Sequence, residues 1–229
     1  MAGVSASKYA MLAVALALSL PHAAQGLSLR LPNGGEVVYV ESFKMTETSS
    51  AGTLSADAER KIKLRVIETA RGRTRFEVTF DDFSVKGSDS GLRDDLRSWL
   101  DAPKREQWVN ERGYVERKDE PRGNRPYFGI VLPPPGASVP DRWTAKLLPP
   151  IGSDRPADFE FKLDPQSGVG GILTILVSAK DRVDAVNLSV VGRVVMGADG
   201  EIRFGDLSTL LEDADAKSTT RIDYRFRKQ

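Results

Sequence analysis

Residues Gly171–Gly205, GILTILVSAKDRVDAVNLSVVGRVVMGADGEIRFG, decide the fold class. Two apolar runs rich in β-branched residues, Ile172–Val177 and Val186–Met196, are followed by a turn at Gly197–Gly200 and a short run at Ile202–Phe204. Apolar runs with turn residues between them are typical of β-hairpins. The stretch therefore predicts the middle of an antiparallel sheet.

The chain before this stretch predicts a meander of strands. Apolar and polar residues alternate through Glu36–Thr48, Thr53–Thr69 and Thr74–Val85, and again at the C-terminus in Thr219–Lys228. A period of two indicates strands with one buried and one solvated face. For Leu207–Ala216 the pattern leaves a helix and an extended edge strand open.

One segment breaks the alternation. Within Gly91–Asp101 the apolar residues recur at helical spacing, and Ser90 is a suitable N-cap; the apolar residues are Leu92, Leu96, Trp99 and Leu100. This spacing predicts one amphipathic helix. A single helix with an apolar stripe is expected to lie on the sheet or to plug its open side.

The middle of the chain is rich in prolines. We expect a hairpin at Gln107–Lys118, a loop at Asp119–Pro126, a short strand from Tyr127 and then a stiff crossing at Pro133–Pro135. Further strands are predicted from Trp143 and at Ala157–Leu163.

The predicted fold class is mainly β, a large curled antiparallel sheet (a half-barrel or open barrel) with one amphipathic helix. Residues 26–229 are expected to form a single domain. A subdomain boundary near residues 133–140 is the alternative.

The N-terminus resembles a secretory signal peptide. Lys8 precedes the apolar run Tyr9–Leu20, and Pro21–Gly26 supplies a helix breaker and small residues. The run is shorter than the roughly 20 apolar residues of a membrane span, so a retained anchor is the less favoured alternative. We expect residues 1–25 to be removed, the protein to be periplasmic or extracellular, and the mature chain to have no transmembrane span.

Composition excludes several chemistries. The chain has no cysteine, and its one histidine, His22, lies in the predicted signal peptide. The mature protein would therefore lack Ser-His-Asp and Cys-His catalysis, and His- or thiolate-ligated metals. With 33 basic and 32 acidic residues, and Lys8 in the leader, the mature chain is neutral, which argues against nucleic-acid binding. We expect no cofactor, metal site or catalytic residue.

Acidic pairs are the remaining candidates for catalysis. They are Asp81/Asp82, Asp94/Asp95, Asp181/Asp184 and Asp213/Asp215. A glycosidase needs two carboxyl groups that face one cleft. Neighbours on a strand point to opposite faces, so a carboxylate-based hydrolase is a distant third hypothesis.

Two sets of residues are candidate binding surfaces. Bases on the polar side of predicted strands would form a cationic patch for lipid phosphates or acidic glycans if those strands are neighbours; they are Lys61, Lys63, Arg65, Arg221, Arg225 and Arg227. Interleaved acids favour the alternative of a solvated face. An aromatic set would line an apolar ligand cavity or simply fill the core; it comprises Trp99, Trp108, Tyr127, Phe128 and Trp143.

The segment Leu132–Trp143, LPPPGASVPDRW, resembles a pattern in uncharacterised exported β-proteins of bacteria, as does the Leu-rich lead into a Tyr-containing strand. Those domain-of-unknown-function families are likened to envelope lipoprotein carriers with half-barrel folds. In place of the usual Gly-Asp before the tryptophan, this chain has Pro140, Asp141 and Arg142. The resemblance implies a fold and supplies no catalytic residue.

These features lead to a functional hypothesis. We expect a non-enzymatic exported envelope protein that binds an apolar or lipid-like ligand in its curved sheet. The alternative is a structural or assembly module that binds other envelope proteins through a sheet edge.

Overall fold

The computed structural model describes residues 27–32, 34–117, 120–134, 140–149, 155–165, 167, 171–183 and 185–229. The predicted signal peptide and most of the predicted boundary at residues 133–140 lie outside these ranges.

The fold is one twelve-stranded antiparallel sheet made of two consecutive meanders. The N-terminal meander comprises β1 (Glu36–Ser49), β2 (Gly52–Ala70), β3 (Arg73–Gly87), β4 (Arg105–Asn110), β5 (Tyr114–Arg117) and β6 (Glu120–Pro126). The C-terminal meander comprises β7 (Arg142–Leu147), β8 (Ala157–Leu163), β9 (Ile172–Val183), β10 (Val186–Gly197), β11 (Ile202–Asp213) and β12 (Ser218–Lys228). The predicted fold class is confirmed.

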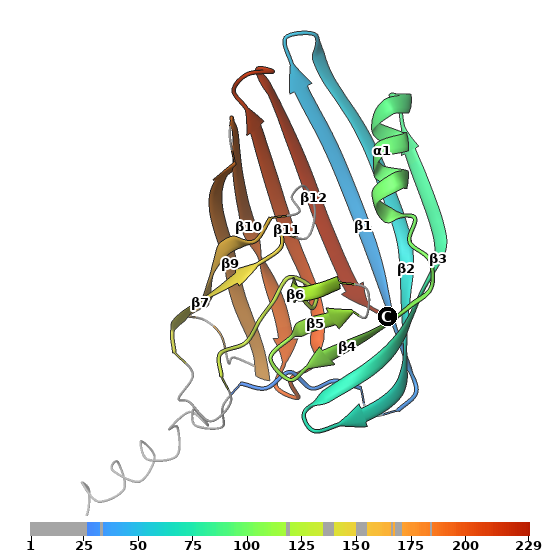
Figure 1. The fold of residues 1–229 in the computed structure, drawn as a ribbon, viewed down its shortest axis with the longest axis vertical. Helices are drawn as coiled ribbons and strands as arrows, with labels where there is room; N and C mark the ends of the chain where they lie inside the picture. The colour runs from blue at the N-terminus through green and yellow to red at the C-terminus, as the bar shows by residue number, and fades with distance from the viewer. Residues whose placement is uncertain are drawn as a thin grey trace, which may run out of the picture.

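The centre of the sheet is the pairing of β1 with β12, which joins the two meanders from Tyr39 opposite Lys228 to Thr48 opposite Thr219. The sheet curls so far that the outer strands β6 and β7 come into contact, and it is nearly closed (Figure 1). The prediction that Gly171–Gly205 forms the middle was wrong in position. Its strands are interior, but they lie within the C-terminal meander, because the pairing of distant strands is set by tertiary packing.

Alternation along the strands divides an inner from an outer face. On β12, Ile222, Tyr224 and Phe226 are buried inside the curve, while Arg221, Arg225 and Arg227 on the opposite face are exposed. On β8, Ala157, Phe159 and Phe161 face inward in the same way. The inner faces of both meanders form one hydrophobic core.

The described residues contain one helix, α1 (Ser90–Leu100), which lies inside the curve against β2 and β3 (Figure 1). Its apolar stripe is Leu92, Leu96 and Leu100, all buried. The small inward residues Ala56 and Ala58 of β2 are buried as well. No helix in the described part of the chain is long and apolar enough to cross a membrane.

The helix begins differently from the prediction. Asp89, not Ser90, is the N-cap, and its carboxylate accepts a hydrogen bond of 2.9 Å from the backbone N–H of Leu92. A cap residue has extended backbone angles, and Asp89 has φ −97° and ψ 131°.

The segment Asp119–Pro126, predicted as a loop, contains β6. The two prolines, Pro121 and Pro126, are tolerated because β6 is an edge strand that pairs with β5 alone. Leu207–Ala216, for which a helix and an edge strand were open, instead contains part of β11, an interior strand paired on both sides with β10 and β12.

The predicted strand from Tyr127 is a buried turn. Tyr127 bridges to Ile130, Phe128 has φ 49°, and Gly129 has φ 76°. A Cβ at Gly129 would lie 2.4 Å from a methyl carbon of Leu207, so the turn packs tightly against β11. It therefore plugs one end of the hollow.

Candidate ligand cavity

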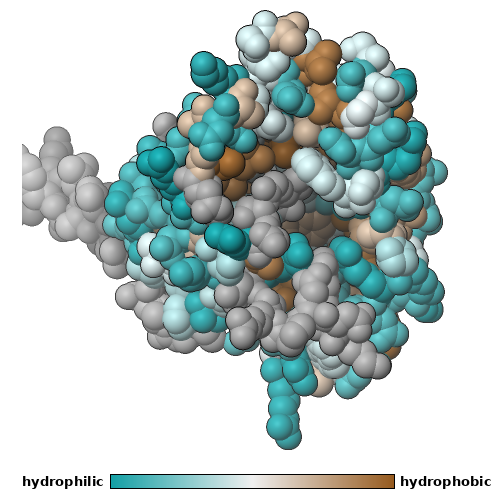
Figure 2. All heavy atoms as spheres, turned by 45° about the horizontal axis from the view of Figure 1, so that its top comes forward, coloured by the Kyte–Doolittle hydropathy of each residue, from teal (hydrophilic) through white to brown (hydrophobic). Residues whose placement is uncertain are grey.

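A cavity of about 660 Å³ occupies the hollow between the inner face of the N-terminal meander, the end of α1 and the Tyr127–Gly129 turn. The apolar part of its wall comes from Phe43, Ile62, Leu64, Val78, Leu100, Val115, Pro126 and Leu148. Figure 2, in which the upper end of the sheet comes forward, shows hydrophobic surface inside a hollow rimmed by hydrophilic residues.

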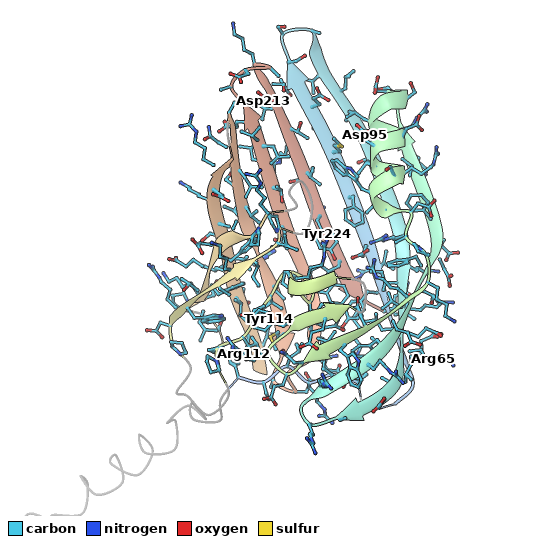
Figure 3. All side chains as sticks on the ribbon, in the orientation of Figure 1. Arg65, Asp95, Arg112, Tyr114, Asp213 and Tyr224 are labelled. Carbon is cyan, nitrogen blue, oxygen red and sulfur yellow. The ribbon has the colours of Figure 1, made fainter. Side chains whose placement is uncertain are left out.

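A buried polar cluster crosses this apolar wall. Glu41 of β1 and Arg60 of β2 are directly opposite in the ladder, and Arg60 Nε lies 2.7 Å from Glu41 Oε2. The hydroxyl of Tyr224, which is labelled inside the curve in Figure 3, donates to the other oxygen of Glu41. Both oxygens of the carboxylate are therefore satisfied, which offsets the cost of burying its charge.

Arg60 also connects the sheet to α1. Its Nη1 donates to the carbonyl of Leu100 at the C-terminal end of the helix, where the helix dipole favours a positive charge. Its guanidinium lies 4.3 Å from the ring centroid of Phe80 and 5.6 Å from that of Phe43. The β2–β3 ladder shifts register at this residue. Bulges of this kind re-aim side chains next to functional sites.

Three more polar residues line the cavity. Arg105 places its guanidinium 5.1 Å from the Phe80 ring centroid, and Arg125 lies on β6. Gln107 is only 8% exposed, and its side-chain oxygen has no hydrogen-bond partner in the described part of the protein. A buried acceptor without a partner is costly, so this oxygen is suited to bind water or a ligand.

The tyrosine hydroxyls of the hollow stay protonated at neutral pH. Burial, followed by the charge of Glu41, raises the pKa of Tyr224 well above its usual value of 10.0. Burial likewise raises the pKa of Tyr39 and of Tyr127. Tyr39 also donates to the carbonyl of Ile202, 3.1 Å away. The hydroxyls of Tyr39 and Tyr224 therefore act as donors.

The structure brings together three of the five aromatic residues predicted to line a cavity, namely Trp99, Tyr127 and Phe128. Trp108 does not line this cavity; it packs against Arg73, whose guanidinium carbon is 4.4 Å from its ring centroid. Trp143 is buried in the C-terminal meander, where it stacks on Phe161 and donates from Nε1 to the carbonyl of Val131 at 2.6 Å.

The predicted basic face is on the outside of the sheet, where acidic residues are interspersed among the basic ones. Ion pairs join Lys61 to Asp82, Lys63 to Asp81, Arg65 to Glu77, and Arg221 to Asp223. Arg225 and Arg227 are exposed on the same side of β12. Arg65, labelled in Figure 3, lies on β2 toward the plugged end. This pattern fits a solvated, charge-balanced surface.

None of the described members of the acidic pairs lines the cavity, and Asp184 lies outside the described residues. Asp81 and Asp82 are engaged by lysines on the outer face, and Asp213 caps a turn by accepting from the N–H groups of Asp215 and Ala216. No group of three or more His, Asp or Glu residues in the described ranges is placed to hold a metal ion.

Sequence reasoning missed the polar residues of the cavity, although a signal was present. On β2, Arg60 falls on the same face as Ile62 and Leu64, and on β1, Glu41 falls on the same face as Tyr39 and Phe43. Opposite charges on the apolar faces of consecutive strands indicate a buried ion pair. For Gln107 no comparable signal exists.

No protein-family model matches the sequence, and no curated protein matches it significantly. Among solved structures, a lipovitellin structure described as showing lipid–protein interactions is similar at a TM-score of 0.48 and 8% identity, over 86% of this chain. This chain spans 25% of the length of that one. DynF from the dynemicin biosynthesis pathway of Micromonospora chersina is similar at a TM-score of 0.27 and 8% identity, over 91% of this chain and 86% of the other. Both TM-scores lie below 0.5, so the function of this chain is argued from its own residues.

Proposed function

We propose that this protein is a non-enzymatic exported protein that binds an apolar or lipid-like ligand in the hollow of its curved sheet. The observation that carries the proposal is the cavity of about 660 Å³, whose wall combines apolar side chains with a cluster of polar ones. Its volume lies within the range of sites that hold one small molecule, and a few polar groups in an apolar wall are the usual composition of such sites.

The energetic argument is burial of apolar surface. Each Å² of apolar ligand surface removed from water contributes about 25 cal/mol. The cavity is built from β1, β2, β3, β4, the end of α1 and a packed turn, so its wall is largely pre-formed. Pre-formed sites lose less entropy when a ligand binds.

The alternative of assembly through a sheet edge has less support. The edge strand β6 contains Pro121 and Pro126, which have no backbone N–H to offer a partner strand. The other edge strand, β7, is six residues long and has Arg142, Thr144 and Lys146 exposed. Short edges with proline or charge are typical of sheets that avoid strand addition.

The proposal is tested by native mass spectrometry of gently purified protein and by binding of the neutral dye Nile red. We expect a co-purified apolar molecule, and a rise in dye fluorescence on binding. Ala102→Trp places a large ring at the cavity wall and should weaken dye binding. The control Ala51→Trp adds the same ring in the exposed β1–β2 turn and should leave binding unchanged.

A bare protein mass together with no dye binding by the natural sequence would contradict the proposal. Equal weakening by Ala102→Trp and Ala51→Trp would place dye binding outside the cavity and would also contradict it.

A further inference from the structure

We propose that the ligand is a neutral molecule with one hydroxyl group, which hydrogen-bonds the amide of Gln107 at the inner end of the cavity while its apolar body extends toward Trp99 at the mouth. The inference rests on the proposed function and names the chemical class of its ligand.

Gln107 of β4 is a buried polar side chain on the cavity wall. It lines the cavity and is 8% exposed, and its oxygen has no hydrogen-bond partner in the described part of the chain. Rotation of the terminal amide exchanges the oxygen with the NH₂ group, so either can meet a ligand. A hydroxyl group both donates and accepts, and it therefore matches the amide in either orientation. Such a bond removes the cost of leaving a buried acceptor unpaired.

The strand registers separate Gln107 from the polar cluster around Arg60. Across the β3 ladder, Gln107 lies at the level of Val66 on β2. A strand rises about 3.3 Å per residue, so the stretch from Arg60 to Val66 separates the two polar groups by roughly 20 Å along the sheet. The cavity wall between these levels is apolar and includes Ile62, Leu64 and Val78. A ligand with one polar end and an apolar body fits this order of side chains.

The mouth of the cavity lies away from Gln107. Trp99, in the last turn of α1, lines the cavity and is 45% exposed. The carbonyl of the next residue, Leu100, accepts a hydrogen bond from Arg60, so this turn lies at the level of Arg60. A molecule that enters beside Trp99 therefore reaches Gln107 only after it has passed the apolar stretch.

The charged groups of the wall are already engaged, which favours a neutral ligand. The two oxygens of Glu41 accept from Arg60 and from Tyr224. Arg105 and Arg125 have interaction partners of their own. A buried ion without a free counter-charge is costly, so a charged head group would lose more on leaving water than this wall returns.

The first test compares ligands of similar length that differ in the polar group. Dodecanol, its isomer methyl undecyl ether, dodecanoate and dodecyltrimethylammonium each compete with Nile red for the full-length mature protein. The ether accepts but cannot donate, so it leaves the oxygen of Gln107 unpaired. We expect the alcohol to bind about tenfold more tightly than the ether. Both ions should bind more weakly than the alcohol.

Variants connect the preference to Gln107. Gln107→Leu replaces the amide by an apolar group of similar size, and it should bring the ratio of alcohol to ether affinity close to one without loss of ether binding. The matched control is Thr74→Val, because Thr74 is also buried on an inner face and lies outside the described cavity wall. It should keep the ratio. Should Gln107→Leu fail to fold, Gln107→Met gives the same comparison.

The orientation is tested by bromine, a short-range quencher of tryptophan fluorescence. Dodecanol brominated at the far end of the chain should quench Trp99, and dodecanol brominated next to the hydroxyl should not. Trp99→Phe is the control, since Trp108 and Trp143 remain, and it should remove the quenching. Quenching of Trp99 by the bromine next to the hydroxyl would overturn the assigned orientation.

The outcomes distinguish this inference from the proposed function. Equal affinity for the alcohol and the ether overturns the hydroxyl group while the apolar ligand stands. Tighter binding of either ion than of the alcohol overturns the neutral ligand. An alcohol preference that survives Gln107→Leu places the hydroxyl elsewhere and overturns the assignment to Gln107. Failure of Nile red and of every competitor to bind overturns the proposed function itself.

Discussion

The two meanders have the same topology and the same number of strands, but their inner faces differ. In the described part of the N-terminal meander four polar side chains are buried, Glu41, Arg60, Thr74 and Gln107. In the described part of the C-terminal meander Thr209 is the one buried polar side chain. The inner face of the N-terminal meander therefore carries most of the buried polar side chains, and Tyr224 is the residue of the C-terminal meander that joins them.

The difference is one of packing as well as of charge. In the C-terminal meander, large inward residues such as Phe159 and Phe161 are completely buried by their neighbours. In the N-terminal meander the inward face of β2 includes Ala56 and Ala58, and α1 covers part of that face. The inward side chains of the C-terminal meander thus fill the space beside that half of the sheet. The N-terminal meander leaves a cavity that its polar residues line.

The largest effect is expected when the polar cluster of the N-terminal meander is broken. Arg60→Met should destabilise the protein by about 3–5 kcal/mol, because Glu41 is left buried without its partner. The double variant Glu41→Gln/Arg60→Met should recover much of this loss. Urea unfolding measures both. Equal costs for the single and the double variant would show that the loss is due to packing rather than to charge.

The same substitution in each half tests the packing difference. Ile175→Ala in the closed C-terminal core should cost about 4 kcal/mol, and Ile62→Ala beside the existing cavity about 2 kcal/mol, because the cost rises with the new space created. Urea unfolding of both variants, fitted with one common dependence of the unfolding free energy on urea concentration, gives the two losses of stability. A larger loss for Ile62→Ala would mean that the cavity is filled in solution.

The contact between the two meanders is tested at Tyr39 of β1, whose hydroxyl donates a hydrogen bond to the carbonyl of Ile202 on β11. Tyr39→Phe should cost about 2 kcal/mol at neutral pH, because a buried carbonyl loses its donor. Burial raises the pKa of Tyr39 in the folded state, so the folded protein holds this proton more tightly than the unfolded chain does.

The resulting stabilisation is complete below the unfolded pKa of about 10 and is lost as the pH rises above it. Tyr39→Phe should reduce the steepness of this alkaline loss in urea titrations at increasing pH. An unchanged slope would assign the loss to other tyrosines.

A smaller effect is expected at the start of α1, the helix that distinguishes the N-terminal meander. Asp89→Ala should cost about 1 kcal/mol through loss of the N-cap bond to Leu92. Ser90→Ala, at the position that the sequence favoured, should change stability by less than about 0.5 kcal/mol. The opposite ranking of the two variants in thermal unfolding would restore Ser90 as the cap.

The smallest effect is expected on the outer face of the N-terminal meander. Lys63 and Asp81 form an exposed ion pair, 2.6 Å between Nζ and Oδ2, and such pairs contribute little in water. Lys63→Met should leave the urea midpoint and dye binding unchanged. A loss of dye binding would indicate that the ligand binds at the outer face of the sheet.

The aromatic part of the candidate site was partly predictable. Trp99 follows from the helical spacing of α1, and Tyr127 and Phe128 stand out as adjacent aromatics before a proline run. Their separation from Trp108 and Trp143 was not predictable, because alternation gives the face of a strand but not which distant strands surround that face.

The sequence by itself determined the fold class, the helix and the two faces of most strands, since period-two and helical spacing are local properties of the chain. Only the tertiary structure decided that β1 pairs with β12, that β11 is interior and that a turn with positive φ at Phe128 fills one end of the hollow. It also decided that Glu41, Arg60 and Tyr224 meet, because their contact depends on pairing between residues up to 183 positions apart. Such pairing is fixed by the burial of the whole inner face, a free energy that no short stretch of sequence contains.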